Sequence, residues 1–90
     1  MEAIYKYPFE IEDCLEINLP FGAHILTAFC QNDIPCLWAL VQPGVGETQK
    51  RKFRIFGTGH PMPEDVDLKW IATFPQFNGK LIWHLFESSD

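Results

Sequence analysis

Turn-forming residues divide this chain into short apolar or alternating segments, and this spacing limits the folds that the chain can adopt. Glycine, proline, asparagine and aspartate separate the segments, most clearly at Pro20-Phe21-Gly22, Asn32-Asp33, Pro43-Gly44 and Asn78-Gly79. Short strands separated by such turns, without a long amphipathic helix, are typical of small sandwiches and barrels. We therefore predict an all-β fold, a small antiparallel sandwich or barrel of about seven short strands with at most one helical turn.

The expected strands cover residues 4–9, 15–19, 24–30, 35–41, 52–56, 69–74 and 80–86. The clearest alternation lies in the second of these segments, where leucine and isoleucine alternate with polar side chains, as in a half-buried strand. In the fifth, Phe53 and Ile55 should face the core. If the chain contains a helical turn, that turn lies near Glu64-Asp65, in the long connection before residue 69.

The turn Asn32-Asp33 predicts a hairpin between the third and fourth expected strands, because both residue types tolerate left-handed backbone. A two-residue loop there places Pro35 opposite Cys30 at a non-hydrogen-bonded position. The missing N–H of proline then costs that pairing no ladder bond.

Asn78-Gly79 is the strongest short hairpin signal in the chain and should join the last two strands. A two-residue loop would place Pro75 opposite Ile82 at a hydrogen-bonded position, which proline cannot satisfy. We therefore expect a bulge or a longer loop in this hairpin.

Residues 36–41 are apolar on both faces of the expected strand, and residues 81–86 are nearly so. A sheet in a small all-β monomer normally exposes one face to water. Either the sheet wraps into a barrel whose outside is covered by loops, or a second subunit covers one face. We expect a homodimer, because exposed aromatic patches usually mark interfaces.

The composition excludes several classes of protein. The 90 residues predict one β-rich domain over residues 1–90. The formal net charge of −5 argues against general nucleic-acid binding, which needs a basic surface to displace counterions. No apolar run approaches the about 20 residues of a membrane-spanning helix. An odd number of cysteines and no secretory signal pattern predict free thiols in a reducing cytoplasm.

Basic, hydroxyl and imidazole side chains gather between residues 50 and 60, beside two glycines. The G-x-G at residues 57–59 does not match a phosphate loop or a dinucleotide fingerprint, since prolines follow in place of a helix. Adjacent N–H groups could still converge on an anion, and the alternative is a strand-ending turn capped by the histidine. The candidate ligand-binding residues are Arg54, Thr58, Gly59 and His60, with Tyr5 and Lys6 as the rim of a pocket or as part of an edge strand.

No catalytic residue, metal or cofactor is predicted. The three histidines and three cysteines show neither C-x-x-C nor H-x-x-x-H spacing, which structural zinc sites usually have. No serine or cysteine has a recognisable base and orienting group. The acidic residues Glu64, Asp65 and Asp67 are typical of a solvated connection.

Four segments carry a family resemblance: IYKYP at residues 4–8, PCLWALV at 35–41, GTGHP at 57–61 and WHLFE at 83–87. With this order and spacing the chain resembles an uncharacterised family of small proteins of bacteriophages and prophages. The resemblance covers nearly the whole chain and brings no activity or catalytic residue with it. It implies a viral protein that acts inside a bacterium.

We therefore expect a non-enzymatic, phage-encoded binding protein in the host cytoplasm, with counter-defence as a role that fits this origin. In the first version it docks on a host or phage protein through an aromatic sheet face or through the loop after Phe56. In the alternative it sequesters a small anionic ligand such as a nucleotide signal. A small hydrolase is the least supported alternative.

Overall fold

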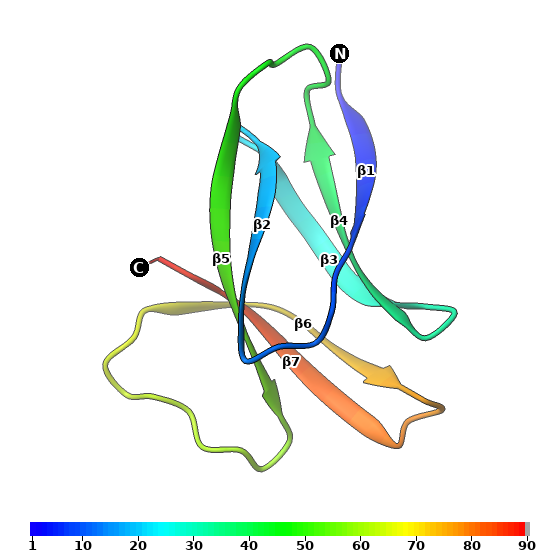
Figure 1. The fold of residues 1–90 in the computed structure, drawn as a ribbon, viewed down its shortest axis with the longest axis vertical. Coiled ribbons are helices and arrows are strands. Elements are labelled where there is room, and N and C mark those ends of the chain that lie inside the picture. The colour runs from blue at the N-terminus through cyan, green and yellow to red at the C-terminus, as the bar shows by residue number, and fades with distance from the viewer. Residues whose placement is uncertain (90) are drawn as a thin grey trace.

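Seven β-strands make up the fold in the computed structural model, which describes residues 1–89 (Figure 1). They are β1 (Ala3–Pro8), β2 (Cys14–Pro20), β3 (His24–Gln31), β4 (Ile34–Val41), β5 (Thr48–Gly57), β6 (Leu68–Gln76) and β7 (Leu81–Ser88). The strands form two antiparallel sheets that pack as a sandwich. No helix occurs among the described residues, and the chain only bends near Glu64-Asp65. The predicted all-β fold is confirmed.

The long strand β5 organises the first sheet, whose strand order is β2-β5-β7-β6. Its first half pairs with β2, where Thr48 lies opposite Pro20. Its second half pairs with β7, where Gly57 lies opposite Trp83. The strand begins at Thr48 and not at the expected residue 52, because the ladder with β2 continues through the basic segment.

The second sheet has the order β1-β4-β3, with the apolar strand β4 in the centre. The hairpin β3–β4 turns at Asn32 and Asp33, whose φ angles of 53° and 63° are left-handed, as the residue types predict. Cys30 lies opposite Pro35, so the predicted register is confirmed. The Pro35 carbonyl accepts a hydrogen bond from the Phe9 amide at 2.9 Å, which fixes the end of β1.

The longer loop expected in the β6–β7 hairpin does not change its register, which is that of a two-residue loop, with the Lys80 amide donating to the Phe77 carbonyl at 3.1 Å. Residues 77–80 separate the two strands, and Phe77, Asn78 and Gly79 all have positive φ. Pro75 still lies opposite Ile82. Pro75 therefore occupies the position that the proline argument disfavours, in the edge strand β6.

The core lies between the inner faces of the two sheets and consists of alternate side chains of the strands. Its members are Leu15, Leu19, Ala23, Ala28, Leu37, Ala39, Val41, Phe53, Ile55, Ala72, Phe74 and Leu85. Phe53 and Ile55 face inward, as predicted, and Phe53 and Phe74 are the largest fully buried side chains. Because only one side chain in two reaches this thin core, each large residue carries a substantial share of the stability.

Strand β4 carries apolar side chains on both faces, and the two faces have different surroundings. Leu37, Ala39 and Val41 are buried in the core. Trp38 and Leu40 lie on the outer face and remain half-buried. The sheets form an open sandwich and not a closed barrel, so the outer side of β4 belongs to a face that is partly exposed to solvent.

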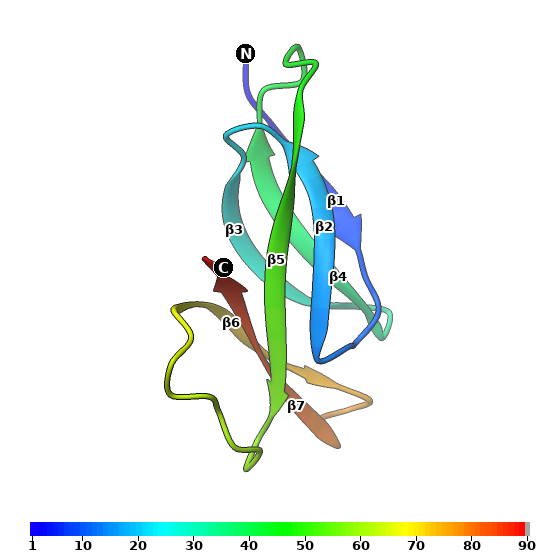
Figure 2. The same ribbon diagram turned by 60° about the vertical axis from the view of Figure 1, so that its left-hand side comes forward.

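Polar contacts also tie the two sheets together. Arg51 on β5 donates to both carboxylate oxygens of Glu87 on β7 and, at 2.9 Å, to the carbonyl oxygen of Ala23 beside β3. The edge strands β3 and β6 approach each other along one side of the sandwich, as Figure 2 shows. Each edge strand carries a bulge, which keeps the two from pairing into one continuous sheet.

Candidate functional site

The segment singled out in the sequence ends β5 with a tight turn over residues 57–60. The His60 amide donates to the Gly57 carbonyl at 3.1 Å, and Gly59 has a φ of 89°, as the third position of a type II turn requires. The Gly57 amide donates to Nδ1 of His60 at 3.3 Å. This amide is therefore already engaged, and the His60 ring lies against the turn.

Thr58 begins a chain of hydrogen bonds that the sequence did not reveal. Its Oγ1 lies 2.8 Å from Nε2 of His84 on β7. The other ring nitrogen of His84, Nδ1, lies 3.0 Å from Oγ1 of Thr73 on β6. Trp70 then donates from Nε1 to the same Thr73 oxygen at 3.1 Å. Four side chains from three segments are thus connected on the outer face of the first sheet.

A bulge at Ile71 makes this arrangement possible. In a regular strand, residues three apart point to opposite faces, so Trp70 and Thr73 could not meet. The register shifts between Trp70 and Ala72, and both Trp70 and Thr73 then lie on the outer face, opposite Phe86 and His84. Bulges that re-aim a side chain in this way are over-represented at functional sites.

Arg54 lies on the same outer face as these residues. It lies opposite Phe86 across the β5–β7 ladder, and its guanidinium carbon is 5.3 Å from the ring centroid of Phe56. The rings of Phe56 and Phe86 meet edge to face at a centroid distance of 5.8 Å. We call the surface formed by these residues the Trp70 face; it comprises Arg54, Phe56, Trp70, Thr73, His84 and Phe86.

The other two candidate residues lie in the other sheet. Lys6 projects from the outer face of β1, where its Nζ donates to Oε1 of Gln31 at 2.7 Å. Tyr5 is on the opposite side of the same strand and is exposed at its edge. The structure therefore places Arg54, Thr58, Gly59 and His60 along one segment and does not bring Tyr5 and Lys6 to them.

The outer face of the β1-β4-β3 sheet carries both apolar and polar side chains, the polar ones being Lys6, His24, Thr27 and Gln31. Its apolar members are Ile4, Phe29, Ile34, Trp38 and Leu40, and we call the surface that they form the apolar face. The rings of Phe29 and Trp38 stack with a centroid distance of 4.1 Å and an interplanar angle of 12°. Beneath them Cys36 is buried, although it lies on the outer face.

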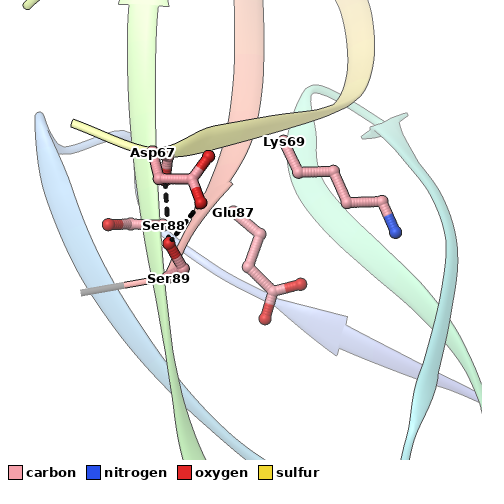
Figure 3. Close-up of a pocket in the computed structure, with 5 residues that line it drawn as sticks. All are labelled: Asp67, Lys69, Glu87, Ser88 and Ser89. Carbon is pink, nitrogen blue, oxygen red and sulfur yellow. Dashed lines mark hydrogen bonds between the residues drawn. The ribbon is translucent and has the colours of Figure 1, made fainter. Parts of the chain in front are cut away.

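A hollow of about 400 Å³ lies where β6 begins and β7 ends (Figure 3). Its lining includes Asp67, Lys69, Glu87 and Ser89. Ser89 Oγ donates to Oδ2 of Asp67 at 3.1 Å, and the Glu87 carboxylate is held by Arg51. Both carboxylates have partners, so we place no ligand there.

Cys30 and Tyr7, both in the β1-β4-β3 sheet, have raised pKa values. Burial raises the pKa of the Cys30 thiol above its ordinary value, and the nearby Asp33 and Cys36 act in the same direction. Burial also raises the pKa of Tyr7, with a smaller contribution from Tyr5. Within residues 1–89, no three histidine, cysteine or acidic side chains are grouped as a metal ion would require.

Of the six residues of the Trp70 face, only Arg54 was a candidate from the sequence; Phe56, Trp70, Thr73, His84 and Phe86 were missed. One signal was available, because the register of the Asn78-Gly79 hairpin already places Thr73 opposite His84. No signal placed Trp70 beside Thr73, since the bulge at Ile71 involves neither glycine nor proline.

Fold and surface define an all-β sandwich protein whose two outer faces each present aromatic side chains. The chain belongs to the DUF7352 family, a domain of unknown function, which it matches over residues 1–90. No curated protein and no solved structure gives a significant match. The described part of the chain contains no apolar helix of the length that a membrane crossing requires.

Proposed function

We propose that this protein is a non-enzymatic binding protein that docks on another protein through the apolar face. The observation that carries the proposal is the exposure of its aliphatic and aromatic side chains: Ile4 is 61% exposed, Ile34 54% and Phe29 45%. Single exposed apolar residues are ordinary, but several gathered on one sheet face are typical of an interaction surface.

The composition of the apolar face resembles that of a protein interface. The stacked pair Phe29 and Trp38 forms a rigid aromatic centre, and such residues supply much of the affinity of protein complexes. Lys6 and Gln31, on the two strands that flank β4, are bonded to each other across the same outer face and add a polar contact to it.

The partner that we propose is a protein of a bacterial host, met in its cytoplasm. The resemblance of this chain to small proteins of bacteriophages and prophages supports this assignment, and counter-defence is the role that fits it. The net charge of −5 favours a protein partner over nucleic acid.

We also propose that two copies of this chain cover the apolar face for each other when the partner is absent. A two-fold axis brings the same patch of both copies together, so the apolar side chains of each copy cover those of the other. This arrangement gives the outer side of β4 the cover that its apolar sequence calls for.

The test compares the wild type with the double variant Ile4→Ser/Phe29→Ser and with Phe21→Ser. Phe21 is an equally exposed aromatic residue in the β2–β3 turn, outside the apolar face, and serves as the control. Native mass spectrometry should show a dimer for the wild type and Phe21→Ser and a monomer for the double variant.

The same three proteins, each tagged, are then used to retain proteins from a bacterial lysate. The proposal expects a protein that the wild type and Phe21→Ser retain and the double variant does not, followed by binding of the purified pair. Retention of the same proteins by all three forms would contradict docking through the apolar face.

A further inference from the structure

The geometry points to a nucleotide site on the Trp70 face, in which Trp70 stacks against the base of a nucleoside monophosphate and Arg54 binds its phosphate. This surface belongs to the β2-β5-β7-β6 sheet, and the apolar face belongs to the other sheet. The inference therefore stands independently of the proposed docking function.

Trp70 is an aromatic platform that is exposed and yet fixed. It is 59% exposed, the largest fraction of any tryptophan in the chain. Its indole Nε1 is nevertheless bonded to Thr73, on the same face because of the bulge at Ile71. A ring held in one orientation loses little conformational entropy when a base stacks on it, which is the advantage of a preorganised site.

The two middle members of the hydrogen-bond chain, Thr73 and His84, each have a partner on both sides. An indole can only donate, so Thr73 Oγ1 accepts from Trp70 and keeps a proton and a lone pair for His84. The imidazole of His84 is bonded at both nitrogens, to Thr73 and to Thr58. The turn after β5 thus fixes His84, which fixes Thr73 and, through it, the indole.

The strand register places Arg54 at a suitable distance from Trp70. Phe86 on β7 has Trp70 directly opposite it on one side and Arg54 on the other. Two strand spacings separate these residues, which puts their Cα atoms about 10 Å apart. Long side chains bridge that separation, so a single mononucleotide can contact both the indole and the guanidinium.

Arg54 has an unused donor. Its Nε is buried and has no hydrogen-bond partner among residues 1–89. An unpartnered buried donor of a charged group is costly. Reorientation of the Arg54 side chain toward a bound phosphate would relieve this cost, because a phosphate oxygen is the acceptor that a guanidinium binds best. The aromatic contact with Phe56 holds the guanidinium over the next outward-facing residue of β5.

The charge on the β2 side of Arg54 is balanced. Lys52 lies next to Arg54 in the hollow of about 590 Å³ beside it, and Glu12 and Glu16 line the β2 side of the same hollow. Glu16 also pairs with Lys50, at 3.9 Å. Two cations balanced by two carboxylates give no net attraction for the extended charge of a triphosphate or of a nucleic-acid strand, so the proposed ligand carries a single phosphate.

The experiment measures binding by calorimetry and by the shift of the Trp70 indole N–H resonance. The probes are the four ribonucleoside monophosphates, adenosine, inorganic phosphate and a six-residue oligoribonucleotide. The variants are Trp70→Leu, Arg54→Met, Thr73→Val and Thr73→Ser, and the control is Lys80→Met, which removes an exposed cation in the β6–β7 loop.

We expect at least one monophosphate to bind and to shift the Trp70 resonance. Trp70→Leu and Arg54→Met should each weaken binding about 10-fold or more, from the loss of stacking and of a charge-assisted bond. Thr73→Val should weaken it several-fold by releasing the indole, while Thr73→Ser and Lys80→Met should bind like the wild type.

Four outcomes would overturn the inference. The first is that no monophosphate binds the folded wild type at millimolar concentration. The second is that Trp70→Leu and Arg54→Met bind as well as the wild type. The third is that inorganic phosphate binds as tightly as the monophosphates, which removes the role of Trp70. The fourth is that the oligoribonucleotide binds more than 10-fold more tightly than the monophosphates, which replaces a free nucleotide by single-stranded RNA.

Discussion

Gln76 on β6 donates from Nε2 to the carbonyl oxygen of Asp33 at 3.0 Å and so joins the β6 edge of one sheet to the hairpin turn of the other. The same side chain accepts a hydrogen bond from Nε1 of Trp83 at 2.8 Å. Asp33 in turn accepts from the Phe77 amide at 3.1 Å through its Oδ1. One buried amide thus fixes the relative position of two hairpins.

The first prediction concerns this contact. Gln76→Ala removes the partner of a partly buried indole N–H and of the Asp33 carbonyl, and leaving such groups unsatisfied costs about 1–3 kcal/mol. We expect the free energy of unfolding in urea to fall by that amount. Gln42→Ala, at an exposed position, is the control and should change it by less than about 0.5 kcal/mol. Equal effects of the two substitutions would contradict a structural role for Gln76.

The second prediction concerns the turn after β5. Gly59 has a φ of 89°, which is left-handed backbone that an L-alanine enters at a cost of about 1–2 kcal/mol. Gly59→Ala should therefore lower the free energy of unfolding by about that amount. It should also displace Thr58, so the ring resonances of His84 should shift.

Gly46→Ala is the matched control for Gly59→Ala. Gly46 lies in the exposed β4–β5 connection and is not among the glycines of positive φ. Its substitution should leave both the stability and the His84 resonances nearly unchanged. Unchanged His84 resonances in Gly59→Ala would mean that the turn does not fix the hydrogen-bond chain.

The third prediction is a pH dependence that comes from Cys30. Burial, with Asp33 and Cys36, raises the pKa of this thiol above its ordinary value of 9.0. The folded protein holds the thiol proton more tightly than the unfolded chain does. The stabilisation is therefore fully present below about pH 9 and is lost as the pH rises through the raised pKa.

The measurement is the difference in free energy of unfolding between the wild type and Cys30→Ala from pH 7 to pH 10. The free energy of unfolding of the wild type should fall relative to that of Cys30→Ala as the pH rises above about 9. For Phe53→Leu, a core variant that changes no titratable group, the difference from the wild type should not vary with pH. A pH-independent difference for Cys30→Ala would contradict the prediction.

The parts of the fold that were predicted well are those that depend on the backbone preferences of residues close together in the sequence. Asn32 and Asp33 adopt the left-handed backbone that their side chains tolerate, and this fixed the register as far as Pro35. The two-faced apolar pattern of β4 indicated a barrel covered by loops or a second subunit; the sheets do not close into a barrel, and the second subunit remains a prediction. The outer side of β4 belongs to the apolar face on which the proposed docking depends.

Long-range pairing determined the parts that could not be predicted. Thr58 meets His84 because β5 pairs with β7, and no local pattern shows which strands of a sandwich become neighbours. For the same reason nothing in the sequence indicated that Lys6 and Arg54 lie in different sheets. The bulge at Ile71 is a third case, since it depends on the fit of β6 to β7 and not on a turn residue.

The last prediction compares two ion pairs of β5. Arg51 and Glu87 have side chains that are only 17% and 22% exposed, and Arg51 also donates to the Ala23 carbonyl. Lys50 and Glu16 are 61% and 49% exposed and 3.9 Å apart. Removing one partner of a mostly buried pair leaves the other charge poorly solvated, whereas an exposed pair contributes little.

Arg51→Met should therefore lower the free energy of unfolding by about 2–4 kcal/mol, and Lys50→Met by less than about 1 kcal/mol. Both substitutions remove one positive charge from the same strand, so they change the net charge equally. Urea unfolding at low and at 0.5 M salt should show that only the Lys50 effect is screened, because partly buried pairs are protected from counterions. Similar losses for the two variants would show that Arg51 acts through net charge and not through its contacts with Glu87 and Ala23.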